Sequence, residues 1–506
     1  MVFRCLSFGI DGIDGFKVEV EASSTMGLPQ IDIVGLPDAA VKESKNRVRS
    51  ALKNSGITLP SSHITVNLAP ADIKKEGSHY DLPLAVVLMQ LIGNLKKNIS
   101  DLAFIGELSL SGEIRRVNGV LPMVIKAREL GIKKIFVPVE NSGEAAVVDG
   151  IDVYCAKNLI ELMNILNEDE VAEKQTSNSV KAGHGKELMP DFCQVKGQYE
   201  AKRALEIAAA GAHNFLLVGS PGAGKTLCAK CLPGILPEMT EQEILETTRI
   251  HSCARRAGDS DDFKPVLTRP FRSPHHSASM ASLVGGGTRL LPGEASLAHN
   301  GVLFLDELPE FNRNVLEALR EPMEEGEISV SRASGTVVWP ARFMMGAAMN
   351  PCPCGYSMDP KRECTCLPEA RKRYREKISG PLLDRIDIQV SVPPVDAAMF
   401  AIKGRGESSA DIRKRVCAAR TVQRNRFRNL PFKSNAEMSS EYARKFASMT
   451  PAVESFAVNA AAKMELSARG YFRLLKVART IADLRGASAV DIMDLSEALR
   501  YRAFRG

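Results

Sequence analysis

The sequence predicts an α/β protein of about three domains with a helical third domain, and three observations support this. The chain has 506 residues, too many for one hydrophobic core. Before the polar stretch at residues 168–188, short strand-like runs such as residues 17–21 alternate with helical patterns such as residues 38–55. From Ser408 onward the apolar spacing is helical. We therefore expect domains at residues 1–167, 189–395 and 396–506, with a linker at 168–188.

Composition and hydropathy argue against a membrane-spanning or a secreted protein. With 44% apolar and 25% charged residues, the chain has the composition of an ordinary globular protein. No apolar run approaches the roughly 20 residues that span a bilayer, and the N-terminus lacks a signal-peptide layout. Eleven cysteines without an export signal favour reduced thiols, so we expect a cytoplasmic protein and no membrane partner.

The net charge of +6 is concentrated near the C-terminus. Residues 396–506 carry 21 Lys and Arg against 11 Asp and Glu. A basic segment of this kind is either a footprint for a phosphate backbone or a solvated helical surface rich in arginine. The count alone leaves both interpretations open.

A glycine-rich motif follows the apolar run at residues 215–218 and precedes a helical pattern. Glycines let consecutive backbone N–H groups point at a phosphate chain, and the N-terminus of a helix attracts anions. Lys225 would reach the β- and γ-phosphates, and the Thr226 hydroxyl would hold Mg²⁺. The motif therefore predicts a P-loop for ATP, formed by Gly219, Ser220, Pro221, Gly222, Ala223, Gly224, Lys225 and Thr226.

A second motif favours hydrolysis over binding alone. Residues 302–305 form a short apolar run, as expected of a buried parallel strand, and end in Asp306 and Glu307. Asp306 is suited to bind Mg²⁺ through water, and Glu307 is suited to polarise the attacking water. An isolated Asp-Glu pair would be an ordinary loop start, but the P-loop upstream favours the catalytic interpretation.

Longer runs resemble one bacterial family. They include GLPD at residues 35–38, RSPHH at 272–276, LAHNGVLFLDE at 297–307 and NPCPCG at 350–355. On these motifs the chain resembles the ComM/YifB family, Mg-chelatase-like members of the AAA+ ATPases, over nearly its whole length. The resemblance implies an AAA+ P-loop core with a parallel sheet, a C-terminal α-helical lid, and an N-terminal Lon-protease-like α/β domain of the type found in ribosomal protein S5 domain 2.

The resemblance also implies roles for three further residues. Asn350, which ends the apolar run at residues 343–349, resembles the sensor-1 residue that orients the lytic water. Arg385 resembles an arginine finger that reaches the ATP of a neighbouring subunit; a salt bridge to an adjacent aspartate is the alternative. Arg469 matches the sensor-2 arginine of the lid, with Arg473 as the alternative. A finger supplied in trans requires an oligomer, and relatives form hexameric rings.

Two segments resemble elements that project into the channel of such a ring. Residues 282–289 have the composition of a loop tip, and residues 326–342 read as two strands around a short turn. They resemble the helix-2 insert and the pre-sensor hairpin of Mg-chelatase-like motors. Arg289 and Arg332 would then contact a DNA backbone, although a solvated hairpin is the alternative.

Four cysteines lie within one short window. Cys352, Cys354, Cys364 and Cys366 form two C-x-C pairs. In a cytosolic chain this favours a structural Zn²⁺ site at residues 352–366 over disulfides, with reduced thiols as the alternative because C-x-C is tighter than the usual C-x₂-C.

Residues 63–162 resemble the proteolytic domain of Lon, which uses a Ser–Lys dyad. Here His79 stands in the place of the nucleophile and Met123 in the place of the lysine. Ser78 is one residue out of register. We therefore expect no peptidase activity from this domain.

Taken together, the resemblance implies an ATP-dependent, hexameric DNA helicase or translocase. It would promote branch migration of recombination intermediates, as in natural transformation, with single-stranded and branched DNA, recombination proteins and further copies of the chain as partners. One alternative is the ATPase motor subunit of a metal-chelatase-type complex that remodels a protein partner. An ATP-dependent protease is a third, and the missing dyad argues against it.

Overall fold

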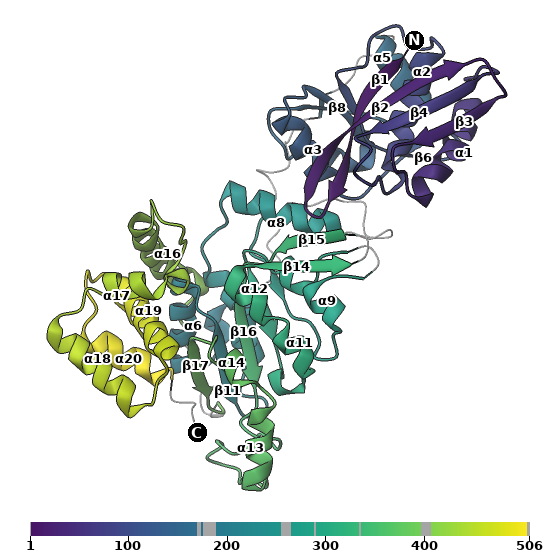
Figure 1. Ribbon diagram of the computed structural model, residues 1–506. Helices are drawn as coiled ribbons and strands as arrows, with labels where there is room; N and C mark the ends of the chain where they lie inside the picture. Colours follow the sequence, from purple (N-terminus) through teal and green to yellow (C-terminus); the bar gives the residue numbers. More distant parts are fainter. Residues whose placement is uncertain are drawn as a thin grey trace. The chain divides into compact units, whose positions relative to one another are not determined.

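The structure is a computed structural model that describes residues 2–168, 174–175, 189–254, 265–287, 290–332, 335–395 and 406–502. The chain folds into two compact units (Figure 1). The first comprises Met1–His184 and Ile244–Val266, and the second comprises Gly185–Glu243 and Leu267–Gly506. A segment from within the predicted nucleotide domain therefore packs with the first unit.

The first unit is built on an eight-stranded mixed sheet with the order β10-β9-β8-β5-β1-β2-β4-β3. Strands β1, β2 and β4 pair antiparallel, whereas β3 pairs parallel with β4 and β5 parallel with β1. This confirms the expected α/β unit with some antiparallel pairing. The strands are β1 (Phe3–Asp11), β2 (Asp14–Thr25), β3 (Gln30–Val34), β4 (His63–Ala69), β5 (Leu102–Phe104), β8 (Lys134–Pro138), β9 (Asp152–Ala156) and β10 (Lys174–Gln175).

Helices cover this sheet, chiefly α1 (Ala39–Asn54), α2 (Asp81–Leu91), α3 (Val120–Glu129) and α5 (Leu159–Asn167). Helix α1 begins where the sequence predicts, because the Asp38 side chain accepts a hydrogen bond from the Val41 N–H at 2.7 Å. Most of α8 (Glu241–Ala254) also belongs here: Arg249 donates to the Ile13 carbonyl at 2.9 Å and to Asp14 at 2.6 Å.

The second unit contains a five-stranded, all-parallel sheet with the order β12-β13-β16-β11-β17. Its inner strands are fully apolar, as expected when helices cover both faces of a parallel sheet. The strands are β11 (Phe215–Gly219), β12 (Phe271–Arg272), β13 (Val302–Leu305), β16 (Met344–Met349) and β17 (Ile388–Val392).

The C-terminal helices pack beside this sheet and share its hydrophobic core, in which Leu217 and Phe304 join Leu474 and Ile481 (Figure 1). They contact the sheet layer through α6 (Tyr199–Gly211), whose last turn accepts a hydrogen bond from Gln423 at 2.9 Å. No helix in the described ranges is long and apolar enough to cross a membrane. The helices are α16 (Ser409–Arg426), α17 (Ser440–Ala447), α18 (Pro451–Lys463), α19 (Ala468–Arg485) and α20 (Ile492–Arg500).

Of the two segments predicted to project into a channel, one has the predicted structure and the other begins in a helix. Strands β14 (Glu327–Arg332) and β15 (Gly335–Pro340) pair antiparallel, which confirms the hairpin at residues 326–342. The predicted loop tip at residues 282–289 instead begins inside a short helix, α9 (Met280–Val284), because the Ser279 side chain caps it. Gly285, Gly286 and Gly287 then follow with positive φ.

Candidate active site

Parallel pairing brings three motifs to one edge of the second sheet. Strands β11 and β13 both pair with β16, and all three end at the same edge. The P-loop follows β11, Asp306 and Glu307 follow β13, and Asn350 follows β16. The predicted nucleotide residues therefore converge, although they lie far apart in the sequence.

The backbone of the P-loop adopts a conformation that depends on its glycines. Gly222 and Gly224 adopt φ values of 78° and 90°, which residues other than glycine rarely adopt. Gly219 is needed for a different reason: a Cβ there would collide with the Val392 carbonyl of the neighbouring strand β17. Helix α7 (Lys225–Lys230) starts directly afterwards, so its N-terminus faces the loop.

Lys225 is held inside this loop. It is 9% exposed, and its ammonium donates to the carbonyls of Gly219 at 2.7 Å and Ser220 at 3.0 Å. It also donates to the Asn350 side chain at 3.1 Å. Burial lowers the pKa of Lys225, partly opposed by the nearby carboxylates. The acceptors that hydrogen-bond this buried ammonium are all neutral, and a phosphate would fit as a directly bonded charged partner.

The residues expected to hold Mg²⁺ also meet. The Thr226 hydroxyl donates to Asp306 at 2.6 Å, which pairs two oxygen ligands of the kind that Mg²⁺ prefers. Glu307 lies one residue on, with a left-handed backbone at φ 53° that costs about 1–3 kcal/mol in a non-glycine residue. Its side chain is 60% exposed and lies 3.4 Å from His276.

Arg385 and Arg469 lie together, and both contact one carboxylate. Arg385 is only 4% exposed, donates to the Pro381 carbonyl at 2.8 Å and forms an ion pair with Glu324. Arg469 lies 3.4 Å from the same Glu324 oxygen. Glu324 is on α12 (Arg320–Glu325), and hydrogen bonding from Arg385 lowers its pKa. The structure thus groups these two arginines with each other.

Arg473, the alternative to Arg469, belongs to a buried network. It lies 3.2 Å from Asp387, and His213 lies 3.2 Å from the same carboxylate. Burial alone would raise the pKa of Asp387, but Arg473 and His213 hold it well below its ordinary value. The other ring nitrogen of His213 bonds Thr480 at 2.8 Å. This network ties the helical lid to the segment that carries Arg385.

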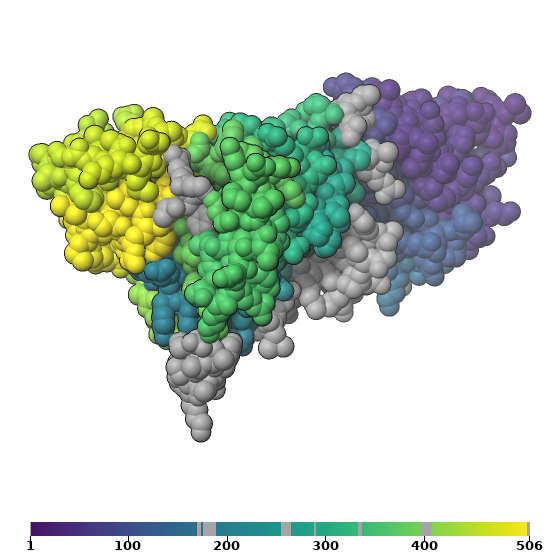
Figure 2. Space-filling view, turned by 90° about the horizontal axis from the view of Figure 1, so that it is seen from below, coloured from purple at the N-terminus to yellow at the C-terminus, as the bar shows by residue number. Residues whose placement is uncertain are grey.

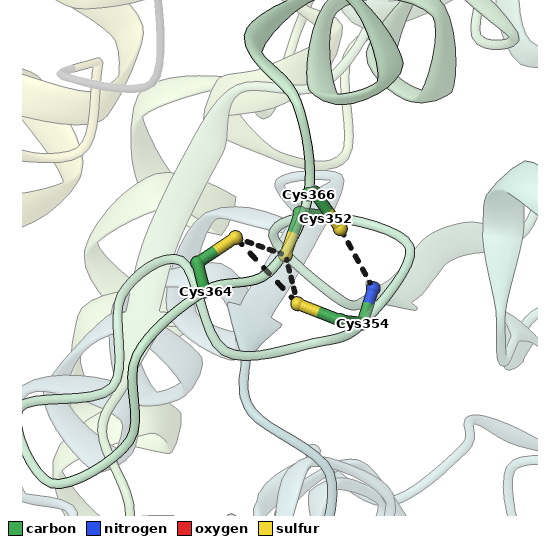
Figure 3. A group of neighbouring side chains, drawn as sticks. All are labelled: Cys352, Cys354, Cys364 and Cys366. Carbon is green, nitrogen blue, oxygen red and sulfur yellow. Dashed lines mark hydrogen bonds between the residues drawn. The ribbon is translucent and has the colours of Figure 1, made fainter.

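The four cysteines form a cluster beside the nucleotide edge (Figure 3). Cys352 Sγ lies 3.3 Å from that of Cys354 and 3.6 Å from that of Cys364, and the Cys354 N–H donates to Cys366 Sγ at 3.3 Å. A disulfide would need about 2.05 Å, whereas sulfurs around a tetrahedral Zn²⁺ at about 2.3 Å lie roughly 3.8 Å apart. A hydrogen bond from the Tyr356 backbone lowers the pKa of Cys354 to about 6. Four neighbouring thiols fit a metal ion that prefers thiolate ligands, such as Zn²⁺.

A cavity of about 570 Å³ adjoins both the nucleotide edge and the cysteine cluster. Seen from below, the green part of the chain that contains α13 (Pro368–Glu376) lies on the near face, beside the yellow lid helices (Figure 2). The cavity is bounded by two of the predicted catalytic residues, Glu307 and Asn350. Its lining residues are Glu307, Glu310, Asn350, Pro353, Ala370, Arg373, Tyr374 and Lys377.

The two predicted DNA-contacting arginines are not placed by the structure. Arg289 lies outside the described residues, and for Arg332 the structure describes the backbone at the end of β14 but not the side chain. Both therefore stay predictions.

Three residues near the site escaped the sequence analysis in their roles. Gln198 donates to the Ala223 carbonyl of the P-loop at 3.0 Å and to the Pro393 carbonyl at 2.6 Å. Glu324 bridges two arginines, and His276 lies beside Glu307. The RSPHH motif at residues 272–276 was a signal for His276, and none of the motifs quoted above includes Gln198. Glu324 lies in an ordinary acidic helix and gave no signal.

The first unit shows no assembled Ser–Lys dyad at the predicted positions. Met123 is fully buried, and His79 is 8% exposed with its pKa lowered by burial to about 4. Ser78 hydrogen-bonds Glu107, while the buried Lys75 donates to the carbonyls of Pro70 and Ile73. The place of a dyad is therefore filled by a thioether and a neutral imidazole.

Three family models of magnesium chelatase subunit ChlI match successive parts of the chain. The family model described as magnesium chelatase, subunit ChlI, matches residues 191–400. Models of subunit ChlI of Mg-chelatase and of its C-terminal region match residues 18–141 and 406–502. These matches cover part of the sheet of the first unit, the parallel sheet with its P-loop, and the C-terminal helices.

Full-length relatives are also similar. The competence protein ComM of Haemophilus influenzae is 42% identical over 97% of this chain and 96% of its own length. YifB of Escherichia coli is 41% identical over 97% of this chain and 95% of its own length. The peroxisomal Lon protease homolog 2 of Caenorhabditis elegans is 29% identical over 150 residues, which are 29% of this chain and 19% of that protein.

Proposed function

The chain belongs to the ComM/YifB family of Mg-chelatase-like AAA+ ATPases, and on that premise we propose that it is an ATP-driven motor that moves DNA. It would act as a homo-hexameric helicase that promotes branch migration of recombination intermediates, as in natural transformation. The observation that carries this proposal is the convergence of Lys225, Asp306 and Asn350 at one sheet edge in a chain that is 42% identical to a competence protein.

In the proposed ATPase site each residue has a separate task. The amides of Gly222 and Gly224 and the Lys225 ammonium would bind the phosphates, and Thr226 and Asp306 would hold Mg²⁺. When bound, Mg²⁺ neutralises charge on the phosphate oxygens. Glu307 would polarise the attacking water, and Asn350, already 3.1 Å from Lys225, would orient it.

We also propose that Arg385 and Arg469 act together on the nucleotide of a neighbouring subunit. Their shared contact with Glu324 supports this, because it groups the two guanidiniums around one carboxylate. An arginine supplied in trans stabilises the charge that spreads over the transferred phosphoryl group. This role requires a ring of several copies.

DNA would contact the channel side of such a ring. The hairpin β14–β15, with Arg332 and Arg289, and the basic segment 396–506 are the candidate contacts. Recombination proteins are candidate further partners. All eleven cysteines are free, which supports a reducing location such as the cytoplasm. We propose that Cys352, Cys354, Cys364 and Cys366 bind one structural Zn²⁺, since four thiolates leave no open position for catalysis.

We propose domain boundaries at residues 1–167, 168–188, 189–395 and 396–506, with the first domain serving assembly or substrate docking. A second candidate function is the motor subunit of a metal-chelatase-type complex that remodels a protein partner. The matched models, all described as magnesium chelatase subunit ChlI, favour it. Similarity of the first unit to Lon favours the DNA motor.

The decisive experiment compares the wild-type chain with Glu307→Gln in phosphate release and in strand exchange on a four-way junction. We expect ATP hydrolysis that single-stranded or branched DNA stimulates, and junction migration that needs ATP. Glu307→Gln should lower hydrolysis by roughly 100-fold while ATP binding persists, because the carboxylate acts on water and not on the nucleotide. A wild-type ATPase that ignores every DNA at low salt would exclude the DNA motor.

A further inference from the structure

The cysteine cluster and the nucleotide edge are joined by a very short stretch of chain. Asn350 directly follows β16, and Cys352, fully buried, comes two residues later. Residues 351–367, all of which the structure describes, form neither helix nor strand. We call this segment the knuckle. Its shape must therefore come from something other than regular hydrogen bonding.

The knuckle packs directly against the P-loop. Gly355 has a φ of 85°, and a Cβ at this position would meet Pro221 Cδ at 2.6 Å and the Asn350 side chain at 3.9 Å. A glycine is thus required both by the backbone and by the close approach of the two loops. Any shift of the knuckle would move the surface on which Pro221 and Asn350 lie.

Helix α13 holds the other end of the knuckle. Arg371 donates to the Cys366 carbonyl at 3.2 Å. The Tyr374 side chain, 7% exposed, is hydrogen-bonded to the backbone of Asn350. Asn350 is therefore held by Tyr374 on α13 and by Lys225 in the P-loop, and the cysteine cluster connects the two sides.

We infer that a Zn²⁺ ion bound by Cys352, Cys354, Cys364 and Cys366 fixes Asn350 against the P-loop and thereby sets the rate of ATP hydrolysis. The inference rests on the ATPase activity proposed above and makes the four cysteines positioning residues. Their sulfurs come from both ends of the knuckle (Figure 3). One ion would therefore close a loop that no helical or strand hydrogen bonds hold together. Binding energy at such a site is folding energy for the segment.

The physical reason is loop entropy. Without a central ion the knuckle gains backbone freedom, and the side chain of Asn350 samples more orientations. Catalysis by positioned groups is sensitive to such displacement, since an error of about 1 Å can cost on the order of 100-fold in rate. The P-loop itself, held by β11 and α7, would still bind the diphosphate.

The first test measures the metal and the two kinetic quantities separately. Full-length wild type should carry about one zinc per chain by elemental analysis. The double variant Cys364→Ser/Cys366→Ser should carry none, with kcat lowered on the order of 10- to 100-fold and the Kd of a fluorescent ADP analogue within about twofold. Cys417→Ser, a partly exposed thiol on α16, is the matched control and should change neither.

The second test asks whether the metal acts through Asn350. In a double-mutant cycle, Asn350→Ala should lower kcat about as much as the cysteine variant, and the combined variant should be no slower than either. If the cysteine variant does not fold, wild-type protein stripped with a mercurial and refilled with Co²⁺ replaces it. The thiolate-to-cobalt absorption band should then return together with kcat.

Three results would overturn the inference: wild type purified without zinc, zinc loss that leaves kcat unchanged, or losses that simply add with Asn350→Ala. A wild-type protein that hydrolyses no ATP would instead overturn the proposed function.

Discussion

The second unit, built on a parallel sheet, and the first unit, built on a mixed sheet, differ in what their predicted functional positions hold. At the edge of the parallel sheet, Lys225 donates to Asn350 and Thr226 donates to Asp306, and Asn350 also lines a cavity. In the first unit the positions that would carry a Ser–Lys dyad hold His79 and Met123, both buried. The same class of fold thus supports a polar site in one unit and a filled core in the other.

The difference teaches that fold and activity are separate properties. The first unit resembles Lon protease in sequence, and its strands and helices form as that resemblance predicts. A methionine can neither accept nor donate a proton at neutral pH, however, and this is why we expect no peptidase chemistry from this fold. The side chains that a fold carries at its functional positions, and not the fold itself, decide what chemistry is expected of it.

Of the changes considered, removal of the Lys225 ammonium should impair the polar site of the second unit most strongly. Lys225→Ala should lower ATP hydrolysis by roughly 100- to 1,000-fold, because a buried positive charge directed at the phosphates is lost. Phosphate release under saturating ATP measures the effect. Lys230→Ala, an exposed lysine on the same helix α7, is the control and should hydrolyse ATP at the wild-type rate.

The stability of the first unit should depend on pH because of the buried His79. His79 has a pKa of about 4 when folded and about 6.5 when unfolded, because burial disfavours its charged form. Between these values the unfolded state binds more protons, so stability falls as pH drops from 6.5 to 4. The total loss is about 3 kcal/mol.

Hydrogen exchange of α2 (Asp81–Leu91), which follows His79, would measure this loss without interference from the second unit. His79→Gln should remove most of the pH dependence, since an amide does not titrate. An unchanged pH profile in that variant would contradict the assignment to His79.

The smallest expected effect concerns Glu324, which holds the two arginines. Glu324→Gln should raise basal ATP hydrolysis about fivefold, because an ion pair worth about 1 kcal/mol, in which Arg385 is buried and Glu324 is partly exposed, no longer retains Arg385. Steady-state ATPase rates without DNA measure the change. Glu321→Gln, an exposed carboxylate on the same helix α12, should have no effect, and a drop in rate for Glu324→Gln would contradict retention.

Much of the architecture was predictable because it depends on local patterns. The apolar run at residues 302–305 becomes β13, Asp38 caps α1, and the hairpin at residues 326–342 forms as expected. The helix at α9 was missed, because a short helix capped by Ser279 has too few turns for a visible period. The packing of Ile244–Val266 with the first unit was also missed, since it depends on contacts such as Arg249 with Asp14.

The sequence by itself determined the P-loop, because this is a contiguous motif whose conformation follows from its own glycines. It also led to the expectation that His79 and Met123 replace a dyad. Only the tertiary structure decided that Arg385 and Arg469 share Glu324, and that the four cysteines lie against the P-loop beside Asn350. Those arrangements depend on the order of parallel strands and on contacts across long sequence separations, which no local pattern encodes.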